Sequence, residues 1–490
     1  MVDLKDFTGG LFDPEGVNFA VPPNGLLTAD NLEFLRSGGI RGRRGFTSYI
    51  TSATAGLTNP IILLWRHYAN GTAANSFLAA RDNSTTVSLL RDGTGTGGFS
   101  TTLITSWTTA QRVYPAFWPQ RNSTFLVNGS NGLYRYDGTN LNTVTNAAVN
   151  VNGPFITVWK SRLWTSLSTE LDRSIYGSNV NDETNFPAGN QLNVSDPQGG
   201  NISGLVGFSD ALIILKETNL WRFIGDIQFG GQLTRYSDQG CIANQSPALT
   251  PYGVIYLARD GVRLTDGLDP EGVELSAPIR PLFVSRSSQA VYTTAVGKWH
   301  ARKNAYYINL LPSATVGYVC TALHTVQGTL QFAWTRHDSL FMNAAASWDS
   351  EADAGQLYTG DNNGMVWEYD TGTTDNATAI TTRLQTVSVP FSPDLKVGRA
   401  AYVRALVRSE GTLSVGQRYD NATANDTSIT LGTTGAIRVQ DVRGVVSNQS
   451  NHGQFLSLYL TASGSYDFEL HVLSTEDSIK PSSRRVWRHD

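Results

Sequence analysis

The chain has 490 residues, of which 40% are hydrophobic and 16% charged, so it has apolar material for folded cores and is not compositionally disordered. Its 37 basic and 41 acidic residues give a net charge of −4, which offers no general attraction to nucleic acids or anionic membranes. The 47 glycines and 11 tryptophans, with only 3 methionines, favour strands and tight turns. We therefore expect an all-β fold.

The N-terminal segment, residues 1–47, lacks the basic and then apolar pattern of a secretory leader, so we expect synthesis in a cytoplasm. No stretch of the chain approaches the roughly 18 to 20 consecutive apolar residues of a membrane helix. The segment has turn residues followed by four arginines: Arg36, Arg41, Arg43 and Arg44. We interpret it either as an extended arm that docks on a neighbouring subunit or as a first strand with exposed arginines.

A hairpin pattern recurs between residues 48 and 372: an apolar strand, a short turn, a second strand and a turn that contains glycine. Asn-Gly and Asp-Gly turns are the strongest local hairpin signals. The clearest copies lie at residues 124–138, 211–225 and 254–267. Weaker copies lie at residues 76–93, 162–177 and 356–372, and a strand at 305–311 with a partner at 316–319 adds another.

The glycines that close the copies are separated by steps of 45, 39, 48, 42 and 105 residues; they are Gly93, Gly138, Gly177, Gly225, Gly267 and Gly372. A period in the forties with several strands per repeat is typical of β-propeller blades. We therefore predict a β-propeller of about six or seven blades over residues 48–372. Ordinary hairpins in stacked sandwiches are the alternative.

Beyond Gly372 the pattern changes, and we expect strands at residues 400–407, 412–415, 456–460 and 468–472. They predict a separate β-sandwich or platform domain over residues 373–490. The last seven residues place three arginines around Trp487, a combination that is enriched at protein interfaces. A solvated terminus is the other interpretation.

The residues offer little support for catalysis. The chain has no G-x-S-x-G and no G-x-x-x-x-G-K-[ST] motif. Acidic residues could serve a glycosidase or bind calcium, but turns select Asp beside Gly for structural reasons. The candidates are Asp260, Asp266, Asp269, Glu271, Asp361 and Asp370.

A metal site is not expected either. His324 follows Cys320 by four residues, and strand residues at that spacing lie roughly 13 Å apart, too far to share one ion. Cys241 and Cys320 are expected to be buried free thiols. We therefore expect no enzyme activity, no catalytic or metal-ligating residues and no cofactor.

Part of the chain resembles a known family. The similarity lies in GGLFD at residues 9–13, PPNG at 22–25, ADNLEF at 29–34 and GIRGRRGF at 39–46, with further stretches at 175–190 and 202–223. In these stretches, which cover roughly the first 230 residues, the chain resembles the tail nozzle, or tail tubular protein B, of short-tailed bacteriophages.

The resemblance implies a structural virion protein in the phage tail, made in the host cytoplasm. It implies a ring, typically of six copies, that lies below the head-to-tail adaptor, anchors tail fibres or spikes and surrounds the exit channel for double-stranded DNA. The net charge of −4 is compatible with a channel through which DNA slides without sequence readout. The residues that we predict to dock on a subunit or the adaptor are Arg36, Arg41, Arg43, Arg44 and Trp487.

A different class of function stays open: a receptor-binding or glycan-recognising propeller, with or without hydrolase activity. It would use exposed aromatic side chains such as Trp164, Trp221 and Trp299 as stacking platforms. The same three residues are also expected in blade cores. Release or specific binding of host polysaccharide would separate this function from a structural one.

Overall fold

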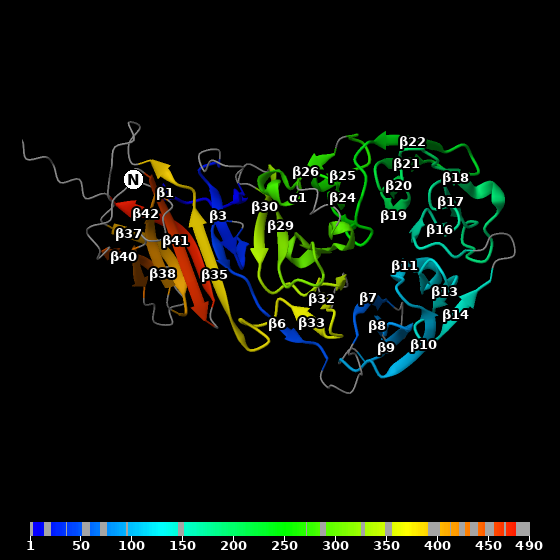
Figure 1. Cartoon of the computed structure of the whole chain (residues 1–490), viewed down its shortest axis with the longest axis horizontal. Coiled ribbons are helices and arrows are strands. Elements are labelled where there is room, and N and C mark those ends of the chain that lie inside the picture. The colour runs from blue at the N-terminus through cyan, green and yellow to red at the C-terminus, as the bar shows by residue number, and fades with distance from the viewer. Residues whose placement is uncertain are drawn as a thin grey trace, which may run out of the picture. The chain divides into compact units, whose positions relative to one another are not determined.

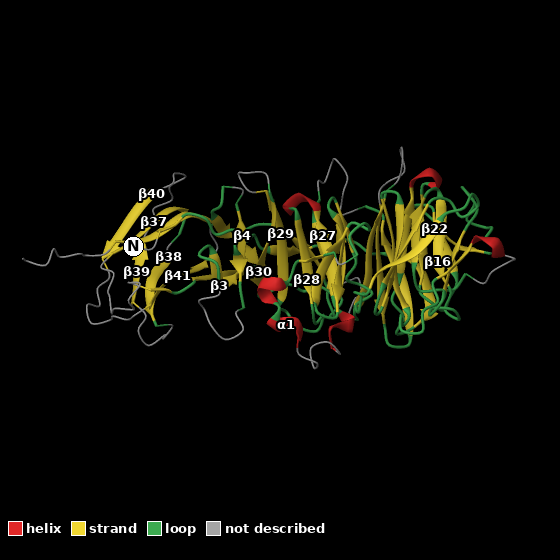
Figure 2. Cartoon of the chain, turned by 90° about the horizontal axis from the view of Figure 1, so that it is seen from above, coloured by secondary structure: helices red, strands yellow, loops and turns green. Residues whose placement is uncertain are grey.

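A computed structural model describes residues 3–13, 21–35, 37–50, 59–68, 76–94, 97–145, 151–270, 272–284, 291–324, 329–347, 355–390, 402–411, 413–420, 427–431, 440–445, 455–464 and 467–476. The chain forms two compact units (Figure 1). Unit 1 comprises residues 1–45, 321–337 and 372–490, and unit 2 comprises residues 46–320 and 338–371. Strands make up nearly all of the regular structure (Figure 2).

Unit 2 contains five four-stranded antiparallel sheets, whose strands follow one another in chain order. We call these sheets blades 1 to 5. Blade 1 consists of β7 (Ile61–His67), β8 (Ser76–Asp82), β9 (Thr86–Asp92) and β10 (Thr101–Thr108), and blade 2 of β11 (Tyr114–Trp118), β12 (Ser123–Val127), β13 (Leu133–Tyr136) and β14 (Leu141–Val144). Blade 3 consists of β15 (Ile156–Trp159), β16 (Arg162–Ser166), β17 (Ser174–Gly177) and β18 (Gln191–Asn193). Blade 4 consists of β19 (Ile202–Phe208), β20 (Ala211–Lys216), β21 (Leu220–Ile224) and β22 (Gln232–Ser237), and blade 5 of β23 (Ala248–Thr250), β24 (Gly253–Ala258), β25 (Gly261–Thr265) and β26 (Val273–Glu274).

Two further blades close the ring. Blade 6 contains β27 (Val296–His300), β28 (Ala305–Asn309) and residues 317–320 of β29 (Gly317–His324). Blade 7 contains β31 (Ala344–Ser347), β32 (Leu357–Gly360), β33 (Val366–Tyr369) and β6 (Phe46–Ser48), which precedes blade 1 in the chain and pairs with β33. Because β31 also contacts β7 of blade 1, the described residues of unit 2 form a seven-bladed β-propeller, in agreement with the predicted propeller of six or seven blades.

Helical structure is confined to short turns in the described part of the chain. The α-helix α1 (Pro281–Val284) has four residues, and the 3-10 turns are η3 (Pro119–Arg121), η4 (Ala188–Asn190), η5 (Ala277–Ile279), η6 (Tyr292–Thr294) and η7 (Ala301–Lys303). Among the residues that the structure describes, none of these helices has the length and apolar character needed to cross a membrane.

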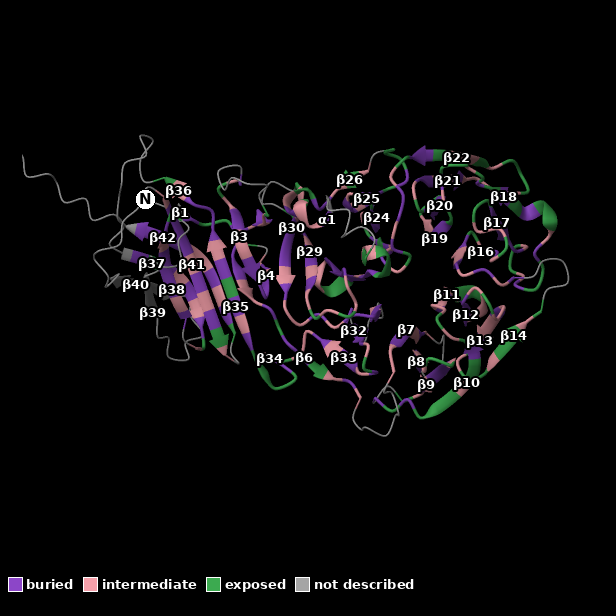
Figure 3. Cartoon of the chain, in the orientation of Figure 1, coloured by how far each residue is buried: buried purple, intermediate pink, exposed green. Residues whose placement is uncertain are grey.

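Each propeller core lies between two neighbouring blades. In β20, Leu212 and Ile214 pack with side chains of blade 3, whereas Ile213 and Leu215 pack with side chains of blade 5. Side chains alternate between the two faces of a strand, so a strand that is covered on both faces has an uninterrupted apolar sequence. The hydrophobic run of β20 is therefore a consequence of its place between two blades, and Figure 3 shows such inner strands as buried.

Arginines on the third strand of several blades reach the next blade. Arg91 of β9 donates from Nη1 to the carbonyl oxygen of Thr139 at 3.1 Å, and Arg222 of β21 donates to the carbonyl oxygen of Gly267 at 2.5 Å. Arg135 of β13 forms an ion pair with Glu183 at 3.0 Å. In each case the acceptor lies in the loop after the third strand of the following blade. These contacts link blades 1 to 2, 2 to 3 and 4 to 5 in the same way.

Unit 1 contains two sheets that share one core. The first sheet has the order β4 (Leu32–Phe34), β5 (Ile40–Gly42), β42 (Phe468–Glu476), β37 (Tyr402–Ser409) and β40 (Gln440–Val445), and β1 (Asp3–Leu4) also pairs with β42. The second connects β30 (Leu330–His337), β3 (Gly25–Asp30), β35 (Thr378–Thr386), β41 (Phe455–Gly464), β38 (Leu413–Tyr419) and β39 (Thr427–Leu431). At its margins lie β2 (Gly10–Leu11), β34 (Thr374–Asp375) and β36 (Val389–Pro390). Ile40, Val403 and Leu470 of the first sheet pack with Leu26, Leu384 and Leu460 of the second.

These pairings place residues 1–45 and 372–490 in one unit, whereas the sequence predicted residues 1–47 and 373–490 as separate parts. Residues 1–45 form neither a separate arm nor a first strand of the propeller, because β3, β4 and β5 belong to the sheets of unit 1. The pattern within residues 1–45 could not reveal this, since the partner strands lie more than 300 residues away in the chain. A β-sandwich made by residues 373–490 alone stays a prediction. Both sheets of unit 1 also contain strands from residues 1–45.

Candidate docking surface

The arginines predicted to dock on a partner have different environments. Arg41 of β5 donates from Nε and Nη2 to Glu33 of β4, at 3.0 and 2.8 Å. Arg44 is exposed. Arg36 and Trp487 lie outside the described residues. Of the five residues, the structure therefore places Arg44 alone as an exposed cation in the described part of the chain.

Arg43 is buried in unit 1, where it binds Asn31 and Asp375. Its side chain is only 3% exposed and bonds to both carboxylate oxygens of Asp375, with Nη1 at 2.7 Å from Oδ1. Nε donates to Oδ1 of Asn31 at 2.8 Å. Because this guanidinium is buried and bonded within unit 1, it is not exposed to a separate protein. Sequence reasoning missed Asp375, since no local signal connects residues 332 positions apart.

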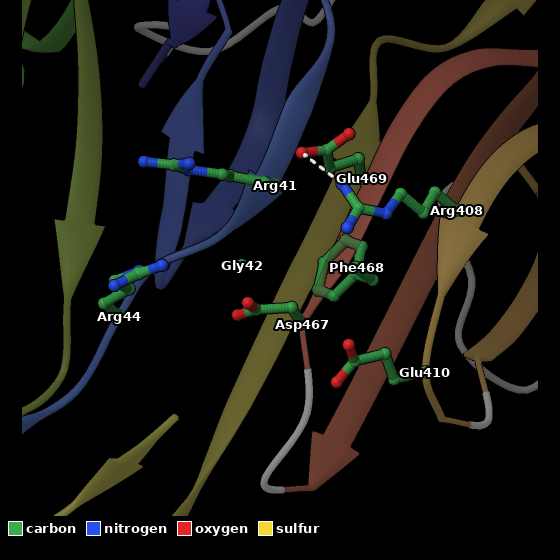
Figure 4. A pocket seen from close by; sticks show the side chains of 8 residues that line it. All are labelled: Arg41, Gly42, Arg44, Arg408, Glu410, Asp467, Phe468 and Glu469. Carbon is green, nitrogen blue, oxygen red and sulfur yellow. Dashed lines mark ion pairs between the residues drawn. The ribbon is translucent and has the colours of Figure 1, made fainter. Parts of the chain in front are cut away.

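Arg41 and Arg44 line a shallow groove together with residues of β37 and β42 (Figure 4). The opposite side carries the exposed carboxylates of Glu410 and Asp467 and the ion pair of Arg408 with Glu469 at 3.5 Å. The cavity volume of the groove is about 40 Å³, which holds little more than a water molecule. The groove is therefore too small for a substrate, and its mixed charges suit the polar rim of a protein contact.

A larger open groove lies in unit 2, between β22 of blade 4 and β25 of blade 5. Its volume is about 750 Å³, and its charged side chains already have partners. Arg235 pairs with Asp196 and Asp238, both at 2.5 Å, and Arg263 pairs with Asp260 at 2.5 Å. The charged side chains that line this groove are therefore held in ion pairs. The lining does not bring together an unpaired acid and an unpaired base, as a catalytic site would need.

Four of the six acidic residues considered for catalysis or calcium binding serve turns and ion pairs: Asp260, Asp266, Asp361 and Asp370. Asp266 accepts hydrogen bonds from the backbone of Leu268, which lowers the pKa of its carboxyl group. Asp361 accepts from the backbone of Asn363 at 2.8 Å and from the indole of Trp367 at 3.2 Å. Asp260 forms an ion pair with Arg263, and Asp370 forms one with Lys303. Glu271 lies outside the described residues.

The sulfur and metal candidates are also placed by the structure. Cys241 and Cys320 are buried free thiols, as predicted. Burial raises the pKa of Cys241 to about 11, so its reactive thiolate form is rare at neutral pH. Within the part of the chain that the structure describes, no three His, Cys, Asp or Glu side chains come together in a group that could hold a metal ion.

The aromatic residues considered as glycan platforms lie largely in cores. Trp164 is 1% exposed and packs with Trp159 and Phe223, and Trp299 is 7% exposed. Trp221 is half-buried, and its indole donates to Asn219 at 3.1 Å. The faces of Trp164 and Trp299 are therefore used for packing in the folded chain.

Comparison with known proteins gives fold similarity alone. No family model and no curated protein matches the chain. The chain is similar to the Pan2 WD40 domain of Neurospora crassa, with 10% identity and a TM-score of 0.37, covering 69% of this chain and 98% of that one. It is also similar to YCF48 from Cyanidioschyzon merolae, with 10% identity, a TM-score of 0.38 and coverage of 64% and 96%. A glycoside hydrolase family 43 arabinoxylan arabinofuranohydrolase from Bacillus subtilis has 9% identity, a TM-score of 0.26 and coverage of 88% and 99%.

Proposed function

We propose that this chain is a structural protein of a short-tailed phage tail, a nozzle subunit that assembles into a ring below the head-to-tail adaptor. The ring would surround the exit channel for double-stranded DNA and anchor tail fibres or spikes. The basis of the proposal is the resemblance in the first 230 residues.

One observation supports the use of that resemblance: its residues stand at positions that build the architecture. A Cβ atom on Gly10 would lie 2.7 Å from the backbone nitrogen of Trp334, and one on Gly45 would overlap the carbonyl oxygen of Thr374. Phe46 begins β6, the strand that completes blade 7, and packs against Trp367. Glycine is required at Gly10 and Gly45 because a side chain would collide with neighbouring backbone.

The chemistry of the described residues fits a structural role. Two of the carboxylates considered for a glycosidase have structural partners: Asp266 binds a turn and Asp260 binds Arg263. Retaining and inverting glycosidases both require two carboxyl groups that flank one bond, with room for a sugar between them. The larger groove is instead lined by paired charges.

Two experiments test the proposal. The purified chain is mixed with the adaptor ring and imaged by electron microscopy; rings seated on one end of the adaptor support the nozzle function. The same chain is incubated with host polysaccharide, and released reducing sugar is measured. Sugar release, or saturable binding of the polysaccharide with no ring on the adaptor, would replace the nozzle function by the receptor-binding one.

A further inference from the structure

Three successive loops of the propeller each expose one large apolar side chain. Val180 follows β17 of blade 3 and is 48% exposed, Phe229 follows β21 of blade 4 and is 87% exposed, and Leu268 follows β25 of blade 5 and is 71% exposed. Each lies in the loop after the third strand of its blade. We call Val180, Phe229 and Leu268 the outer-turn patch.

The three loops lie on one face of the propeller. In a four-stranded antiparallel blade, the turns after the first and third strands are at the same end. Lys160, in the first turn of blade 3, donates to the carbonyl oxygen of Gly225 in the loop of blade 4 at 3.3 Å. Arg222 then bonds to Gly267 in the loop of blade 5. These contacts make the loops neighbours, so a single partner segment can cover the patch.

Each of the three loops also carries a carboxylate within three residues of its exposed apolar side chain. Asp182, Asp226 and Asp266 accept hydrogen bonds from backbone nitrogens two residues further on, at 3.0, 2.8 and 2.8 Å. These bonds fix each carboxylate beside the apolar residue of its own loop. Arg162 shares Asp226 at 3.3 Å. The loops of blades 3 to 5 thus combine apolar surface with fixed negative charge.

A segment of matching chemistry exists in the same chain. Residues 477–490 follow β42 and lie outside the described residues. Between residues 480 and 489 they contain Lys480, Arg484, Arg485 and Arg488, with no acidic residue, and the arginines flank Val486 and Trp487. Trp and Arg are among the residues that most often provide binding energy at protein interfaces. Fully extended, fourteen residues span at most about 50 Å.

We propose that the C-terminal segment of one copy, residues 477–490, binds the outer-turn patch of a second copy. Trp487 and Val486 cover the apolar side chains, and the arginines pair with the carboxylates between them. The inference rests on the proposed function in taking the second copy as the neighbour in a ring. Such a head-to-tail contact uses two different surfaces, which is the type of interface that closes cyclic rings.

The test uses two full-length variants that are mixed before oxidation. One carries Gln228→Cys beside the patch, and the other carries His489→Cys beside Trp487, so that the residues of the contact stay intact. A disulfide between them can form only between two copies. Because Cys241 and Cys320 are buried, they do not compete. We expect a cross-linked dimer on a denaturing gel without reductant.

Two controls test whether the cross-linked dimer reports the proposed contact. Adding Phe229→Ser and Leu268→Ser to the Gln228→Cys chain is expected to reduce the dimer at least about 5-fold without a change in Tm, because both side chains are exposed. Val291→Cys, at a residue 48% exposed outside the patch, replaces Gln228→Cys as the matched site and is expected to give little dimer. No dimer, equal dimer from Val291→Cys, or dimer insensitive to the two serines would overturn the inference.

The mass of the chain on the adaptor separates this result from the proposed function. A ring that forms on the adaptor while the cross-link fails overturns the tail contact alone. A specific cross-link in a protein that ignores the adaptor supports the tail contact and counts against the nozzle function.

Discussion

The two units are built from the chain in opposite ways. Each of blades 1 to 5 is one continuous segment, in which every strand pairs with the next strand along the chain. In unit 1, β5 pairs with β42 and β3 pairs with β35, so strands from the two ends of the chain lie side by side. The strand pairs of blades 1 to 5 therefore join segments that are close in the sequence. In unit 1, these paired strands lie hundreds of residues apart in the chain.

The same contrast appears in the use of arginine. In the propeller, Arg91 and Arg222 each bind backbone carbonyls of the next blade, so stabilisation is distributed over several similar contacts. In unit 1, one buried arginine, Arg43, joins Asn31 and Asp375. A single substitution should therefore damage unit 1 more than the propeller.

The largest expected effect is that of Arg43→Ala. Removing the guanidinium leaves the carboxylate of Asp375, only 10% exposed, without its partner, and such changes cost about 3 to 5 kcal/mol. The free energy of unfolding, measured by denaturant titration, should fall by that amount. Arg41→Ala is the control, because its 34% exposed pair with Glu33 should contribute at most about 1 kcal/mol. Equal losses for the two variants would contradict the contrast.

His67 should make the stability of the propeller depend on pH. His67, between blades 1 and 2, bonds to Thr124 at 2.9 Å, and burial lowers its pKa from 6.5 to about 4. Above pH 6.5 it is neutral in both states. Between pH 6.5 and 4 the unfolded chain takes up a proton that the folded chain does not, so stability falls as pH falls, by on the order of 3 kcal/mol in all.

His67→Asn isolates this contribution, since its side chain does not titrate. The difference in unfolding free energy between the two proteins should change between pH 7 and 4.5 and be flat from pH 7 to 8. A difference that is constant from pH 8 to 4.5 would show that His67 titrates alike in both states.

The next effect is expected at Gly153, where the segment before β15 lies close to the backbone of β16. A Cβ on Gly153 would overlap the carbonyl oxygen of Ser166, so Gly153→Ala should cost roughly 2 kcal/mol or more by thermal unfolding. Gly189→Ala is the matched control, because no atom lies within 4 Å of its Cβ position. It should change stability by less than about 1 kcal/mol. If Gly153→Ala leaves stability unchanged, the segment before β15 can move away from Ser166 without cost.

The smallest effect is expected for one contact between blades. Arg222→Ala removes a charged hydrogen bond to Gly267 and should lower the free energy of unfolding by about 1 to 2 kcal/mol. Arg280→Ala, at a 54% exposed arginine 4.0 Å from Glu274, should have almost no effect. A loss for Arg222→Ala as large as that for Arg43→Ala would remove the distinction between distributed and concentrated stabilisation.

The sequence predicted the propeller because its signals are local. The Asp-Gly turn at residues 266 and 267, for example, follows the predicted hairpin that forms β24 and β25. Blade 7 was only partly predictable, since its fourth strand, β6, comes from before blade 1. The repeated arginine shortly before the closing glycine, as at Arg91 and Arg135, is a signal that could have identified the contacts between blades.

The candidate docking residues were less predictable. A cluster of arginines at residues 36–44 gives no indication of which side chain is buried, because burial depends on Asp375, far away in the chain. The outer-turn patch was missed for a different reason. Val180, Phe229 and Leu268 are unremarkable alone, and only the stacking of blades makes them neighbours.

The most direct test of the nozzle function is the mass of the full chain in solution and on the adaptor ring, by native mass spectrometry or light scattering. The proposed function predicts one discrete ring of several copies, formed on the adaptor. A monomer or trimer that ignores the adaptor and binds cell-surface glycan would contradict it.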